Sequence, residues 1–77
     1  MSITQFRRDA PVEAIIMVKA DVPPGVSVSS NVGGTGHLII AYCRNWRELP
    51  ALTRRCQEIE HEIRAGRITS GFKEIRG

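Results

Sequence analysis

The sequence predicts a small α+β domain, in which an antiparallel sheet of three or four strands packs against one long C-terminal helix. Two segments, 12–20 and 37–43, are rich in β-branched and aliphatic residues and are bounded by proline, glycine or charged residues. A third segment, 45–66, carries apolar residues at helical spacing. With the order strand, strand, strand, helix, a two-layer sandwich is the simplest assembly, and residues 1–77 form a single domain.

The predicted helix has start and stop signals as well as an apolar stripe. The stripe residues recur at spacings of three and four, which places them on one face: Leu49, Leu52, Cys56, Ile59 and Ile63. Asn45 and Glu48 make a capping-box-like pair at the start, and Gly66 tolerates the left-handed conformation that often ends a helix. Because Pro50 lacks an N–H donor, we expect either a distorted first turn at 46–49 or a helix that begins at Pro50.

Three predicted strands precede this helix. Segments 12–20 (VEAIIMVKA) and 37–43 (HLIIAYC) are apolar on both faces, whereas segment 26–29 (VSVS) alternates and predicts a short strand with one solvated face. The sequence VPPG at 22–25 is typical of a turn, and the glycine-rich segment 31–36 is typical of a flexible connection.

An apolar patch is expected on the sheet face that the helix leaves uncovered, because one helix covers only one face. Alternation along the two long strands assigns these residues to it: Ile15, Met17, Ile39 and Ala41. Contiguous exposed apolar patches usually mark a partner surface. Two interpretations stay open, namely a homodimer or partner interface, and a face that the N-terminal or C-terminal segment covers.

The two ends of the chain carry weaker signals. Residues 1–10 suit an edge strand or an arm, and residues 67–77 suit a flexible tail or a short helical turn. The N-terminal residues lack the pattern of a signal peptide, and no apolar run approaches the roughly 20 residues that a membrane-spanning helix needs. We therefore expect a cytoplasmic protein with no membrane partner.

A cluster of arginines predicts a second candidate surface. The net charge of +3 and the pI near 9.4 favour acidic partners slightly without specifying nucleic acid. The arginines load the first half of the helical segment: Arg44, Arg47, Arg54 and Arg55. Glu58, Glu60 and Glu62 follow, which reverses the order that the helix dipole favours. Arginines form forked bonds to carboxylate or phosphate, so the cluster is either a partner-binding patch or a solvated face with pairs along the helix.

No pattern of residues supports catalysis or metal binding. Among the candidate zinc ligands, His37 and Cys43 lie about 20 Å apart along a strand, and Cys56 and His61 diverge by about 140° around a helix. The glycine-rich loop 33–36 precedes a strand and lacks the lysine of a phosphate-binding loop. We therefore expect no cofactor, no metal and no enzymatic activity.

The resulting functional hypothesis is a non-enzymatic protein-binding module, an inhibitor or adaptor that meets a partner with an acidic surface. A motif-free chain this short is typical of accessory proteins of phages and mobile elements, which often block a host or defence complex. The alternative is a nucleic-acid-binding module that uses the arginine patch at the start of the helix. The scarcity of aromatic residues, four in the chain, and the glutamates among the arginines weigh against that alternative.

Overall fold

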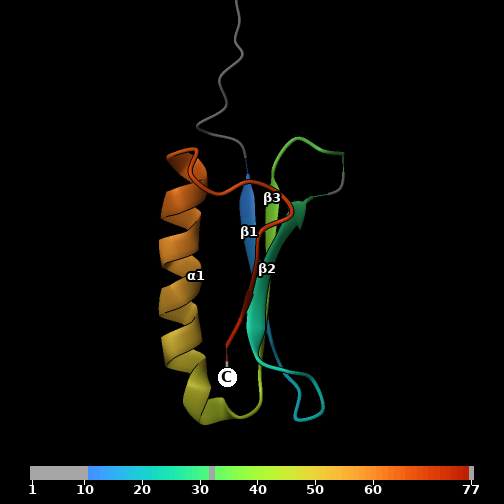
Figure 1. Ribbon diagram of the computed structural model, residues 1–77, viewed down its shortest axis with the longest axis vertical. Coiled ribbons are helices and arrows are strands. Elements are labelled where there is room, and N and C mark those ends of the chain that lie inside the picture. Colours follow the sequence, from blue (N-terminus) through green and yellow to red (C-terminus); the bar gives the residue numbers. More distant parts are fainter. Residues whose placement is uncertain (1–10, 32, 77) are drawn as a thin grey trace, which may run out of the picture.

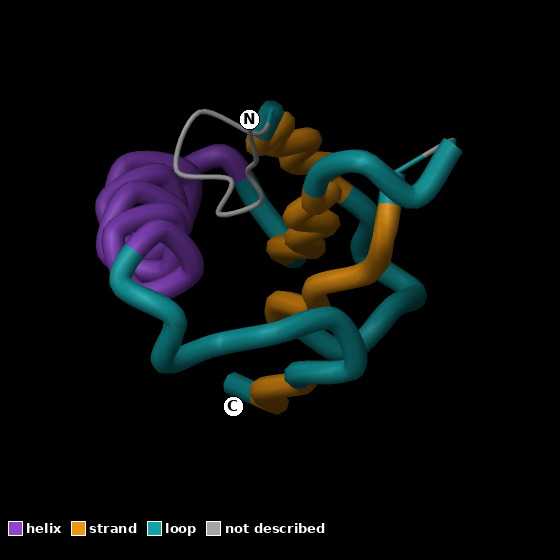
Figure 2. Tube along the Cα trace, turned by 90° about the horizontal axis from the view of Figure 1, so that it is seen from above, coloured by secondary structure: helices purple, strands orange, loops and turns teal. Residues whose placement is uncertain are grey.

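A computed structural model describes residues 11–31 and 33–76 of the chain (Figure 1). The elements, in chain order, are β1 (Val12–Val18), β2 (Gly25–Ser30), β3 (His37–Cys43), the 3₁₀ turn η1 (Trp46–Glu48), α1 (Leu49–Arg64) and β4 (Lys73–Ile75). The four strands form one sheet in the order β1-β3-β2-β4, and α1 packs against one of its faces (Figure 2). The predicted α+β class, a small sheet packed on one C-terminal helix, is confirmed. The edge strand or arm expected at residues 1–10 lies outside the described residues.

The sheet is mixed, although a wholly antiparallel sheet was expected. Strand β2 pairs antiparallel with both β3 and β4. Strand β1, in contrast, runs parallel to β3, with Val12 opposite His37 and Val18 opposite Cys43. Strand β3 therefore lies between β1 and β2, where both of its edges are paired. Its apolar side chains on each face have neighbours on the two adjacent strands. Residues 19–24 easily span the roughly 10 Å across an inserted strand, so turn residues alone do not make β1 and β2 neighbours.

The C-terminal segment contains a strand, β4, where a flexible tail or a short helical turn was expected. Gly71 N–H donates to the Val28 carbonyl at 2.8 Å, and Val28 N–H donates to the Phe72 carbonyl at 2.9 Å. These bonds lead the chain onto the free edge of β2, which would otherwise leave its backbone groups unpaired. Gly71 has φ of 101°, a value that breaks a helical path.

The helix begins with the distorted turn that Pro50 predicts. The turn η1 precedes α1, and Pro50 lies in the first turn of α1, where its missing N–H has no helical partner to lose. The Asn45 Oδ1 accepts a hydrogen bond from Arg47 N–H at 2.9 Å, and Asn45 Nδ2 donates to Glu48 Oε2 at 3.3 Å. The capping residues therefore fix the direction in which the chain enters the helix.

The core lies between α1 and the sheet. Its buried residues come from one face of two strands, β2 and β3, and from one helical stripe: Val26, Val28, Ile39, Ala41, Cys43, Leu52, Cys56, Ile59 and Ile63. All the buried residues on the helix belong to the predicted stripe. In β2 the valines face the helix, as the alternation of VSVS predicts.

Two residues expected on the uncovered face, Ile39 and Ala41, instead lie in this core. They are 1% and 0% exposed, so neither can contact a partner or a second copy. We call the sheet face opposite α1 the far face. The register and the alternation of side chains place these apolar residues of β1 and β3 on it: Ile15, Met17, Leu38, Ile40 and Tyr42. Because β3 is apolar from position 38 to 43, its periodicity does not indicate which set faces the helix, and the pairing register decides it.

Candidate functional site

An open groove of about 980 Å³ lies between the start of α1 and β4. Its walls come from segments that are distant in sequence, namely the turn η1, the first half of α1 and the C-terminal strand. The arginines that line it are Arg44, Arg47, Arg55 and Arg76. The glutamates that line it are Glu48, Glu58 and Glu74. The groove thus carries a small excess of positive charge.

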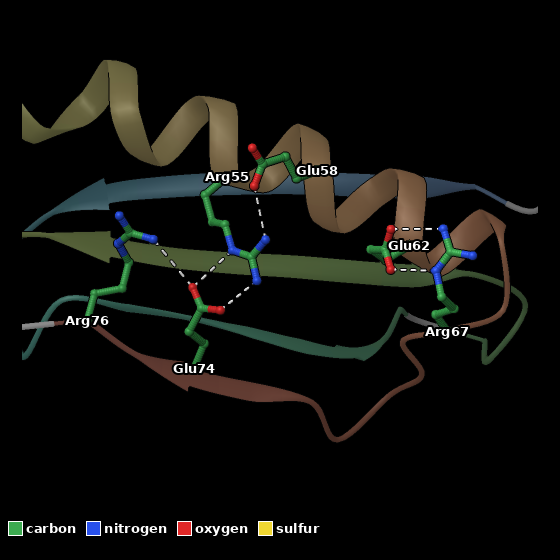
Figure 3. A network of polar contacts seen from close by, with 6 residues as sticks. All are labelled: Arg55, Glu58, Glu62, Arg67, Glu74 and Arg76. Carbon is green, nitrogen blue, oxygen red and sulfur yellow. Dashed lines mark hydrogen bonds and ion pairs between the residues drawn. The ribbon is translucent and has the colours of Figure 1, made fainter.

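Arg55 ties α1 to β4 across the floor of this groove (Figure 3). Its Nε and Nη2 donate to Glu74 Oε2 and Oε1 at 3.1 and 2.6 Å, and its Nη1 donates to Glu58 Oε1 at 3.0 Å. Arg76 Nη1 adds a longer contact of 3.4 Å to Glu74 Oε2. The hydrogen bonds that Arg55 donates to Glu74 and, to a lesser extent, to Glu58 raise the pKa of Arg55. The hydrogen bonds from Arg55 also lower the pKa of Glu74. Arg55, expected to bind a partner, therefore holds the groove together.

Arg44 and Arg47 differ from Arg55 because they make no ion pair within the described residues. Both side chains are exposed, and both line the groove. Arg54 is also exposed and without an ion pair in this part of the chain, but it does not line the groove. The structure thus brings Arg44, Arg47 and Arg55 together and leaves Arg54 outside the group.

Trp46 is the residue of this region that the sequence patterns did not single out. It is 72% exposed, although tryptophan is usually well covered in a folded protein. It lies on η1, the turn that also supplies Arg47 and Glu48 to the groove wall. Ile75, which lines the groove from β4, is 68% exposed. The available signal was the position of the chain's single tryptophan, directly after a helix-capping residue and outside the buried stripe.

The apolar candidates behave differently from one another. Ile15 is 46% exposed on the far face, and Met17 is half-buried on the same face. Ile39 and Ala41 lie in the core, as described above. The far face therefore keeps an apolar character, but Leu38, Ile40 and Tyr42 supply it in their place.

The two cysteines are both free and buried. Cys56 lies on the buried helix stripe, and burial raises the pKa of its thiol. Among the described residues, no group of three or more His, Cys, Asp or Glu side chains is placed to hold a metal ion. The same residues include no helix that is both long enough and apolar enough to cross a membrane.

Both thiols are expected to resist modification in the folded protein. Each is shielded from solvent, and only the thiolate form reacts with a disulfide reagent or a maleimide. We expect labelling to be at least about 100-fold slower in native buffer than in denaturant, where local opening is no longer required. Mass spectrometry of the labelled chain measures this rate, and rapid native labelling of either thiol would contradict the buried placement.

Comparison with known proteins gives no match: no protein-family model, curated protein or solved structure matches the chain. The fold and the groove therefore identify the chain only as a small α+β domain that has an exposed tryptophan beside arginines. The function is argued from those residues alone.

Proposed function

We propose that this protein is a non-enzymatic protein-binding module that meets an acidic partner with the end of the molecule formed by η1 and the groove. The observation that supports it is the exposed Trp46, held on a capped turn beside Arg47, which lines the groove. Tryptophan and arginine are the residue types most enriched among the energetically dominant contacts of protein interfaces.

The physical support for binding is that these side chains have unused contact capacity. A tryptophan buries about 150–250 Å² when a partner covers it, and most of the Trp46 surface is still accessible. Arg44 and Arg47, which have no ion pair in the described residues, can form forked hydrogen bonds to carboxylates of a partner. The cap at Asn45 holds their backbone before binding, which reduces the entropy lost on association.

The proposed role is that of an inhibitor or adaptor, because a rigid binding tip is all that such a protein needs. Accessory proteins of phages and mobile elements often block a host or defence complex in this way. The absence of a motif for catalysis in the sequence fits this role. The partner is expected to present carboxylates around an apolar socket that receives the indole.

The test is capture of a partner by the tagged protein from an extract of the source cells. We expect the wild type to retain a partner that the double variant Trp46→Ala, Arg47→Glu does not retain. Removal of two dominant contacts should weaken binding by about 100-fold or more. Arg54→Glu is the matched control, since it reverses the same charge outside the groove and should leave capture intact. Capture that survives the double variant would contradict the proposal.

Nucleic-acid binding stays the second candidate because Arg44, Arg47 and Arg54 are exposed without ion pairs in the described residues. The groove glutamates weigh against it, since Glu48, Glu58 and Glu74 repel phosphates. Binding of this kind would weaken steeply as salt rises. If labelled single-stranded and duplex DNA and RNA both stay unbound at about 50 mM salt, this candidate is excluded.

A further inference from the structure

No helix or strand of the described residues covers the far face of the sheet (Figure 2). Two rows of side chains cross all four strands on this face, as the pairing register shows. The first row consists, from β1 to β4, of Ile15, Ile40, Ser27 and Lys73. The second row consists of Met17, Tyr42, Gly25 and Ile75. In the first row the large apolar residues lie on β1 and β3, and in the second row Ile75 on β4 joins them. In both rows the small residue lies on β2.

We propose that the far face is an interface with a second copy of this chain, related to the first by a two-fold axis parallel to the strands. Rotation about such an axis leaves each residue at the same position along the strand direction and reverses the order of the strands across the sheet. Strand β3 of one copy then lies opposite β2 of the second copy, and β1 lies opposite β4. The interface is isologous, as closed dimers usually are.

The central strands support this axis because they pair large residues with small ones. Ile40 and Tyr42 of one copy lie opposite Ser27 and Gly25 of the second copy. A hollow of about 230 Å³ already exists on this face, and its lining includes Gly25, Tyr42 and Pro23. The second copy's Tyr42 ring can enter that hollow. Two sheets pack at about 10 Å only when their side chains interdigitate in this manner.

The edge strands support the same axis through charge. Glu13 lies on the β1 edge and Lys73 on the β4 edge of the far face, and neither makes an ion pair within the described residues. The axis places Glu13 of each copy near Lys73 of the other, displaced by about 7 Å along the strands, which their side chains can span. It also places Met17 opposite the second copy's Ile75. An axis perpendicular to the strands would instead place each edge against itself, without these pairs.

The area of the face indicates the strength of association. Four strands of up to seven residues give a footprint of about 20 by 23 Å, on the order of 450 Å² per copy. This lies at the low end of specific interfaces, which commonly bury about 800 Å² per partner. We therefore expect a reversible dimer with a dissociation constant in the micromolar range.

The test is sedimentation equilibrium, which should give twice the chain mass of 8.6 kDa for the wild type at about 100 µM. Glu13→Lys and Lys73→Glu should each raise the dissociation constant about tenfold or more, because two like-charged pairs then meet. The double exchange restores opposite charges and should return the constant to within about threefold of wild type. Arg54→Glu, on the helix layer, should have no effect.

A second variant checks the centre of the interface without the charges. Ser27→Arg adds a long side chain that points out of the sheet, where it blocks β3 of the second copy and leaves the core untouched. It should give only monomer at about 100 µM, with an unchanged circular dichroism spectrum. A monomeric wild type at this concentration would overturn the proposal. A dimer that persists in the Ser27→Arg variant would equally overturn it, and so would a dissociation constant that the double charge exchange fails to restore.

Discussion

Replacing Ile59 with alanine is expected to lower the free energy of unfolding by about 2–5 kcal/mol. Ile59 is 0% exposed and lies in the middle of the helix stripe that packs on the sheet. The removed methylene and methyl groups lose their contacts, and the surrounding side chains cannot close the cavity completely. A domain of 77 residues has a total stability of roughly 4–12 kcal/mol, so this loss removes a large fraction of it.

Urea unfolding followed by circular dichroism measures this loss. Trp46→Ala is the matched control: it removes a larger side chain that is 72% exposed, so the free energy of unfolding should change by no more than about 0.5 kcal/mol. Comparing Ile59→Ala with Trp46→Ala also separates folding from function, because Trp46→Ala is the variant expected to weaken partner binding while the domain stays folded. A loss below about 1 kcal/mol for Ile59→Ala would show that α1 does not pack on the sheet as described.

Replacing Glu74 with glutamine is expected to destabilise the fold by roughly 1–2 kcal/mol at neutral pH, after allowance for solvent screening. The two side chains of the Arg55–Glu74 pair are 28% and 25% exposed, and two hydrogen bonds join them. Because the pair joins α1 to β4, its loss should first release the C-terminal strand. Faster amide exchange at Arg76, whose N–H donates to the Pro24 carbonyl, is the local readout.

The same pair predicts a pH dependence. The hydrogen bonds from Arg55 hold the pKa of Glu74 below its ordinary value, whereas the pKa of a glutamate in the unfolded chain is about 4.3. The stabilisation from Glu74 is therefore complete above about pH 4.3 and is lost as the pH falls through the lowered folded pKa. Wild-type stability should fall in that acid range, and the Glu74→Gln variant should fall less steeply.

Glu62→Gln is the control for both measurements. Glu62 also accepts two hydrogen bonds from an arginine, Arg67, at 2.7 and 3.0 Å, and they lower its pKa. Arg67, however, is largely exposed, so solvent competes for its guanidinium. The effect of Glu62→Gln on stability should be the smaller one. Equal effects of the two variants would contradict the assignment of Arg55–Glu74 as the tie between layers.

The predictable part of the fold is the part that local patterns determine. The helix stripe around Cys56 and Ile59, the cap at Asn45 and the distorted turn before Pro50 all depend on residues a few positions apart. The alternation of β2 is similarly local, because its serines mark the solvated face. These features are in the structure as predicted.

The unpredicted part depends on pairing between distant segments. No pattern in HLIIAYC distinguishes the face of Ile39 from that of Ile40, since both are apolar; only the register with β1 and β2 does. The spacing of Ile68, Phe72 and Ile75 fits a helical turn as well as a strand, and the free edge of β2 decides between them. The parallel pairing of β1 arises in the same way.

The candidate site likewise has a part that local sequence patterns predict and a part that depends on distant segments. The sequence predicted a cluster of four arginines at the start of the helix, namely Arg44, Arg47, Arg54 and Arg55. In the structure Arg44, Arg47 and Arg55 line the groove and Arg54 does not. The role of Arg55 did not follow, because its partner Glu74 is 19 residues away and reaches it only after β4 has formed. The exposure of Trp46 likewise depends on the turn that η1 adopts.

The two proposed surfaces have a geometric consequence when taken together. An axis parallel to the strands keeps both copies' η1 turns at the same end of the dimer. The far face and η1 also belong to opposite layers, so dimerisation leaves Trp46 accessible. A dimer would therefore present two binding tips at one end, on opposite outer layers, which raises the apparent affinity for a partner with suitably spaced repeated sites.

The fluorescence of Trp46 tests the central claim, that this end of the molecule binds a protein, most directly. It is the only tryptophan in the chain, so, with a partner that lacks tryptophan or carries a non-fluorescent analogue, the emission reports on this site alone. Binding of the purified partner should shift the emission to shorter wavelength and protect the indole from quenching by acrylamide. Dilution through the dimer–monomer transition should change neither. Emission and quenching that stay unchanged when the partner is bound would contradict the proposal.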